Sequence, residues 1–202
     1  MTSAAAPTRA ELAETASLLE RSRDELLDFC RRLPATDWNR SDGAGRWTVA
    51  QILDHLVIIE KRSVPVLEAM IQAGPDPDWA AKTLHKDAIL ARAEVVEKPV
   101  VAPAPLHPSL TPEPERLLTE FAAARQATLG LLARPGLELK QYVRTHPAFG
   151  DVNLLQNLRL LAFHTRRHLS QMRGCTEAES HATPASGQAL VHGAEASWAK
   201  SR

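Results

Sequence analysis

The sequence predicts an all-α fold, a four-helix bundle with a long crossover connection between helices two and three. Four segments of about 20 to 26 residues carry apolar side chains at helical spacing. Aromatic residues make up only 4% of the 202 residues while leucine and alanine are abundant, which favours helices packed on helices over a sheet. A proline-rich stretch separates the second segment from the third, so a bundle with one long connection is the simplest architecture.

The first helix is predicted over residues 8–33. Thr8 and Glu11 form a capping-box pattern at its start, and Pro34 ends it. Charged residues occupy the face opposite an apolar stripe, so the helix should lie at the surface of the bundle. The stripe consists of Leu12, Ala16, Leu19, Leu26, Cys30 and Leu33.

The second helix follows a loop dense in turn formers. Thr48 and Gln51 repeat the capping-box pattern, and helical spacing continues to about Gln72. Gly74 then interrupts the pattern. Pro65 lies within the helix and is expected to kink it.

Residues 74–113 form the predicted crossover connection. A short helix is expected around residues 79–96, followed by the proline-rich stretch KPVVAPAPLHPSLTPEP lying over the bundle. The third helix should open near Pro114, since proline suits the first turn, and end at Arg134 and Pro135.

The fourth helix is predicted to start at Asn153, a good N-cap with Gln156 three residues later. The segment THPAFGD before it is dense in turn formers, and we expect a turn there. Gly174 is expected to close the helix. We therefore place one domain at residues 1–175 and a weakly ordered C-terminal tail, small and polar in composition, at residues 176–202.

Charge and composition narrow the function classes. The 24 basic and 24 acidic residues balance, which gives no net attraction to nucleic acid or to an anionic membrane. The chain has no secretion-signal pattern near its start and no long apolar span, so we expect a cytoplasmic protein. Cys30 and Cys175 are too few for a disulfide framework, and reduced thiols are expected.

The stretch HTRRHLSQ at residues 164–171 raises the question of a metal site. His164 and His168 are four residues apart on a predicted helix, so their imidazoles project from one face and can share a divalent ion. His55 lies in the apolar stripe of the second helix and should also face the bundle interior. Each histidine taken alone is better explained as a hydrogen-bonded core or boundary residue, so the hypothesis depends on all three meeting.

Three imidazoles around one ion leave a coordination position open, as in catalytic sites. The candidate ions are zinc, nickel, manganese and iron, and imidazole also suits copper. Thr165 follows His164 where a zinc protease helix carries a glutamate, so a metalloprotease is disfavoured. The ion's positive charge would favour hydroxide, a thiolate or another anionic group in the open position.

Three segments, in order and spacing, resemble the DinB-like superfamily of metal-dependent enzymes, which includes the YfiT-like proteins. They are WTVAQILDHL at residues 47–56, PSLTPEPERLLTEFAAARQ, and HPAFGDVNLLQNLRLLAFHTRRHLSQM at residues 146–172. The resemblance implies a four-helix bundle, often dimeric, with a divalent ion held by one histidine of helix two and two of helix four. Those positions correspond here to His55, His164 and His168.

Four further residues are candidates for supporting roles. Gln171 shares the face of the histidine pair and could orient a water molecule on the metal, or could simply pack at the bundle end. His146 opens the turn before the fourth helix, where it could meet a substrate or only shape the turn. Arg167 could pair with an anionic substrate, although an exposed helix arginine is the simpler interpretation, and Trp47 is interpreted as a hydrophobic staple or pocket wall.

The other histidines and the second cysteine receive no role. Gly174 separates Cys175 from the histidine pair, so Cys175 is not expected to bind the metal. The remaining histidines fall in the crossover or the tail: His85, His107, His181 and His192.

The leading hypothesis is a metal-dependent hydrolase in which the ion activates water for attack on a small-molecule substrate. The first alternative is a thiol-dependent transferase or isomerase. The second is a helical stress-response module that binds metal without turnover. No nucleic-acid or membrane partner is expected, and a homodimer is consistent with the resemblance.

Overall fold

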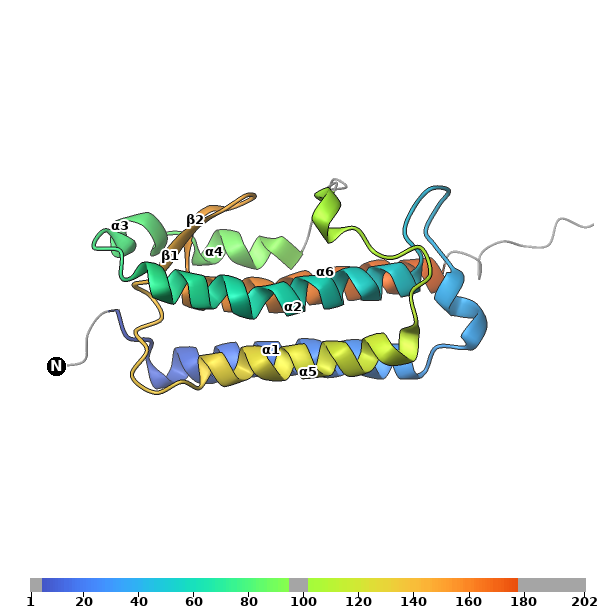
Figure 1. Ribbon diagram of the computed structural model, residues 1–202, viewed down its shortest axis with the longest axis horizontal. Helices are drawn as coiled ribbons and strands as arrows, with labels where there is room; N and C mark the ends of the chain where they lie inside the picture. Colours follow the sequence, from blue (N-terminus) through green and yellow to red (C-terminus); the bar gives the residue numbers. More distant parts are fainter. Residues whose placement is uncertain (1–4, 95–101, 178–202) are drawn as a thin grey trace, which may run out of the picture.

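The computed structural model describes residues 5–94 and 102–177. Four long helices form the bundle, as predicted, with α2 and α6 in one layer and α1 and α5 in the other (Figure 1). They are α1 (Arg9–Arg31), α2 (Val49–Ala73), α5 (Pro114–Leu132) and α6 (Leu154–Glu177). Helix α2 packs against α5 and α6, and α1 packs against the same two helices. The two histidine-bearing helices, α2 and α6, are therefore neighbours.

Short elements complete the fold. The antiparallel strands β1 and β2 pair from Val143 with Asn153 to His146 with Gly150, and they lie with α3 and α4 on the side of α2 and α6 away from α1 and α5 (Figure 1). The short elements are η1 (Ala35–Asn39), α3 (Trp79–Thr83), α4 (Asp87–Leu90), η2 (Ala91–Glu94), η3 (Ala104–Leu106), β1 (Val143–His146) and β2 (Gly150–Asn153).

Reciprocal capping hydrogen bonds set the start of three long helices, as the sequence predicts. In each case a side chain accepts from the backbone N–H three residues later, and the side chain of that later residue accepts from the cap's own N–H, so two otherwise unpaired donors are satisfied. The pairs are Thr8 with Glu11, Thr48 with Gln51, and Asn153 with Gln156. Helix α5 instead begins with Pro114 in its first turn.

The prediction that Gly174 closes the fourth helix is wrong. Helix α6 continues to Glu177, and Cys175 lies buried in the core beyond the glycine. Burial of that side chain outweighs the cost of about 1 kcal/mol for a glycine inside a helix. The first two residues of the predicted tail, 176 and 177, are therefore helical, and the rest of the tail lies outside the described residues.

Two connecting segments also differ from the expectation. The turn expected at THPAFGD is the tip of a β-hairpin. The two strands are too short to give a periodic signal in the sequence. The hairpin is held in place by the buried Val152, which packs on Leu90 and Leu160. The helix expected over residues 79–96 is broken into α3, α4 and η2, and its last two residues lie outside the described ones. Helix α2, in contrast, continues through Pro65.

A buried ion pair ties the four long helices together. Arg125 of α5 donates from Nε and Nη2 to both carboxylate oxygens of Glu60 of α2, at 3.0 and 2.6 Å. Its remaining N–H groups donate to the Leu19 carbonyl and Ser22 hydroxyl of α1 and to the Thr165 hydroxyl of α6. Both charged side chains are essentially inaccessible to solvent, at 0% and 1% exposure.

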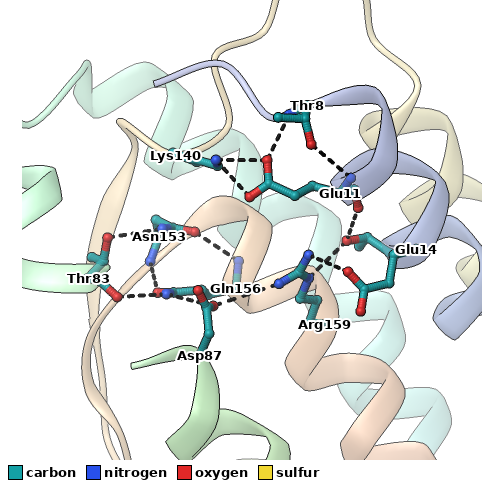
Figure 2. Close-up of polar contacts among 10 residues, drawn as sticks. Thr8, Glu11, Glu14, Thr83, Asp87, Lys140, Asn153, Gln156 and Arg159 are labelled. Carbon is teal, nitrogen blue, oxygen red and sulfur yellow. Dashed lines mark hydrogen bonds and ion pairs between the residues drawn. The ribbon is translucent and has the colours of Figure 1, made fainter. Parts of the chain in front are cut away.

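A second polar network fixes the start of α6 (Figure 2). The Gln156 amide donates to the Thr83 carbonyl and the Asp87 carboxylate, and the Asn153 amide donates to the Thr83 hydroxyl. One turn later, Arg159 pairs with acids of α1 and α4. These bonds join α6 to α1, α3, α4 and the hairpin, which sets the position of the residues farther along α6.

No helix within residues 5–94 and 102–177 is long and apolar enough to cross a membrane.

Replacing Arg125 by methionine should lower the free energy of unfolding by about 3–5 kcal/mol, because the Glu60 carboxylate is then buried without a partner. The double variant Arg125→Met/Glu60→Leu should recover much of that loss. Urea denaturation measures both, with Lys61→Gln, which removes an exposed ion pair, as the control expected to change little. A single Arg125 variant as stable as the wild type would contradict the role of this ion pair.

Candidate metal centre

The structure brings the three predicted histidines together. His55 of α2 and His164 and His168 of α6 each offer a ring nitrogen, and these three atoms lie within 4.8 Å of one another. The imidazole centroids are 4.5 to 5.4 Å apart. The four-residue spacing on α6 and the packing of α2 against α6 explain the meeting. His55 and His168 are buried, and His164 is nearly so.

Hydrogen bonds orient two of the rings. His55 Nδ1 donates to the Leu106 carbonyl oxygen at 2.8 Å, and His168 Nδ1 donates to the Gln171 side-chain oxygen at 2.9 Å. Because carbonyl and amide oxygens only accept, the proton sits on Nδ1 in both rings and the Nε2 lone pair is left free. This is the arrangement in which protein histidines bind metals, with the other nitrogen held by an outer partner.

His164 places its Nε2 next to that of His168. Its Nε2 lies 3.2 Å from Nε2 of His168, and its Nδ1 is buried with no hydrogen-bond partner. Two imidazole nitrogens bound to one tetrahedral zinc ion at about 2.05 Å are about 3.3 Å apart, close to the observed separation. The donor set and the separation of the two Nε2 atoms therefore fit a divalent ion.

Burial keeps the three imidazoles neutral. Desolvation is the main cause that lowers the pKa of all three, to about 3 for His168 and well below the ordinary value for His164. Repulsion among the rings and from the Arg167 guanidinium acts in the same direction. Neutral imidazole is the form that binds metal, so the site needs no proton release near pH 7.

The crossover connection and the loop before α2 form one wall of the site. The Trp47 ring lies against His55, with centroids 4.9 Å apart, and also contacts His107 at 6.2 Å. The Ser109 N–H donates to the Asp54 carboxylate at 2.7 Å, which fastens the crossover to α2 one residue before His55. Trp47 thus contacts His55 and also packs against the hydrophobic core, as the structural interpretation of this residue predicts.

The structure also places the other sequence candidates. Gln171 contacts His168 directly, and His146 is the last residue of β1. Arg167 is half-buried, unlike the exposed arginine expected. Cys175 lies in the core, where burial raises the thiol pKa, so it is no metal ligand of this site. His85 is exposed, and the predicted tail histidines, His181 and His192, lie outside the described residues.

Sequence reasoning missed three groups at this site. The Leu106 carbonyl is a backbone atom and leaves no mark in the sequence. Asp54 resembles any charged residue on a helix surface. His107 lies in an aperiodic proline-rich stretch, where no spacing predicts its neighbours.

A family model described as the DinB superfamily matches residues 18–172, most of the chain. The chain belongs to the DinB superfamily. The chain is also similar to the uncharacterized protein YuaE of Bacillus subtilis (strain 168), with 24% identity over 162 residues that cover 80% of this chain and 96% of that protein.

A solved structure is similar to this DinB superfamily member over most of its length. It is that of YfiT from Bacillus subtilis, described as a probable metal-dependent hydrolase with an unusual four-helix bundle topology. The TM-score is 0.51 at 15% sequence identity, over 89% of this chain and 92% of that one. At this identity the similarity supports the fold.

Acid should destabilise the metal-free protein through these histidines. The pKa of His168 is about 3 in the folded protein against about 6.5 unfolded, so the unfolded chain takes up protons first as pH falls. The histidine contribution to stability is therefore complete above about pH 6.5 and is lost progressively toward pH 3.

Urea denaturation of metal-free protein at pH 7, 6 and 5 measures this effect. The triple variant His55→Gln/His164→Gln/His168→Gln should show a shallower decline in unfolding free energy than the wild type. Equal slopes for the two proteins would show that the rings are not held neutral.

Proposed function

We propose that this protein is a metal-dependent hydrolase of small-molecule substrates, in which His55, His164 and His168 bind a divalent ion. The observation that carries the proposal is the convergence of three neutral imidazoles, two of them oriented by hydrogen bonds on Nδ1 and the third with its Nε2 3.2 Å from that of His168. A structural zinc site is normally closed by four protein ligands, whereas the described residues offer three here. The donor set therefore favours chemistry at an open position.

A bound divalent ion would supply Lewis acidity, which lowers the pKa of water toward about 7 and makes a nucleophile available near neutral pH. The chain's own residues hold the site for that chemistry. Leu106 and Gln171 fix the ring orientations of His55 and His168. Trp47 shields His55, and a drier surrounding strengthens electrostatic interactions at the centre.

Metal content and turnover test the proposal together. Wild-type protein purified without an affinity tag should contain about one divalent ion per chain, and His55→Ala, His164→Ala and His168→Ala should each lose it. The matched control is His85→Ala, which removes an exposed histidine and should keep the ion. Inductively coupled plasma mass spectrometry measures the content.

The same proteins should be assayed on a panel of small esters and amides. Hydrolysis should require the ion, fall to background in the three ligand variants, and persist in His85→Ala. A wild type that remains metal-free after incubation with zinc, nickel, manganese and iron would overturn the proposal. Product formation that requires an added thiol and does not consume water would indicate thiol transfer instead of hydrolysis.

Gln171 should act on the metal through His168. Gln171→Leu removes the acceptor for His168 Nδ1–H and should weaken zinc binding about 10- to 100-fold, while Gln171→Glu, which keeps an acceptor, should bind more nearly as the wild type does. Competition with a chromogenic chelator measures the affinity. Ser170→Ala, an exposed neighbour, is the control, and an unchanged affinity in Gln171→Leu would contradict the positioning role.

A further inference from the structure

One face of the β-hairpin packs against α6 beside the three histidines. Arg144 pairs with Val152 across the hairpin, so both side chains lie on the same face, and His146, two residues along β1, shares it. Val152 is buried against Leu160 of α6. The hairpin therefore turns Arg144 and His146 toward α6.

The facing side of α6 carries one metal-ligand candidate and one arginine. His164 is four residues beyond Leu160 and Arg167 is three residues beyond His164, so the three side chains follow one another along one face of the helix. Arg167 directly precedes His168 on the same helix. Arg167 therefore lies beside the three-histidine centre, and Arg144 lies on the hairpin face that packs on the same helix at Leu160.

These two arginines lack the acidic partners that their neighbours have. On α6, Arg159 pairs with Glu14 and Arg166 pairs with Glu25. Within the described part of the chain, neither Arg144 nor Arg167 has an ion pair, and the Arg144 Nε is buried without a hydrogen-bond partner. Both arginine side chains are half-buried. A desolvated cation without a partner is costly unless it binds an anion.

We propose that Arg144 and Arg167 form an oxyanion-binding subsite next to the three histidines, and that the substrate carries a carboxylate or phosphate group that binds there. The inference rests on the proposed function, because the anion is taken to belong to the substrate. A guanidinium binds either group through paired N–H donors. His146 adds a neutral donor, since its Nδ1 accepts from the Ala148 N–H and its proton therefore sits on Nε2.

Anion binding to the full-length protein tests the subsite. Isothermal titration calorimetry with sodium phosphate and with sodium acetate, on metal-free and on zinc-loaded protein, should show binding of at least one anion in both forms. Arg144→Gln and Arg167→Gln should each weaken it at least tenfold. Arg166→Gln, the ion-paired neighbour, should leave it unchanged, and Arg144→Lys should retain more affinity than Arg144→Gln because it keeps the charge.

The two anions distinguish the substrate classes, since tighter acetate binding indicates a carboxylate and tighter phosphate binding a phosphate group. The inference would be overturned if neither anion binds. It would also be overturned if the wild type, Arg144→Gln and Arg167→Gln bind the anion with equal affinity. The metal-free protein is measured as well, so the two proposals can fail separately. If only the metal site is wrong, the protein takes up no zinc but still shows anion binding that depends on the two arginines.

Discussion

The buried pair of Arg125 and Glu60 is the interaction on which the arrangement of this bundle depends. Arg125 on α5 reaches Glu60 on α2, backbone and hydroxyl groups on α1, and Thr165 on α6, so one side chain touches all the long helices. Such a cation is tolerated in the interior only when every partner is in place, which restricts how the helices can slide past one another. Apolar packing alone would accept several alternative alignments.

The same restriction on helix sliding also fixes the relative positions of the three histidines. Glu60 lies five residues after His55 on α2, and Thr165 directly follows His164 on α6. A shift of α2 against α6 that separated the histidines would also break contacts of the buried arginine. The hairpin network at the start of α6, around Gln156, holds the same helix from its other end. The three histidines are therefore positioned by polar contacts that do not themselves touch the site.

Much of this architecture was predictable because it rests on local rules. Capping pairs and apolar spacing located the long helices, and the four-residue interval between His164 and His168 predicted their convergence. What was missed depends on distant contacts. The hairpin is held by Val152 against α6, the extension past Gly174 by the burial of Cys175, and the orientation of His55 by a carbonyl of the crossover, and none of these has a periodic signature.

We propose that His55, His164 and His168 bind one divalent ion and leave a position open for chemistry. A crystal structure of the zinc-loaded protein, with anomalous data on both sides of the zinc absorption edge, tests it most directly. We expect one edge-dependent peak about 2.0–2.1 Å from a nitrogen of each ring, with no fourth protein ligand. A peak elsewhere, a peak that lacks one of the three rings, or a fourth protein ligand would contradict it.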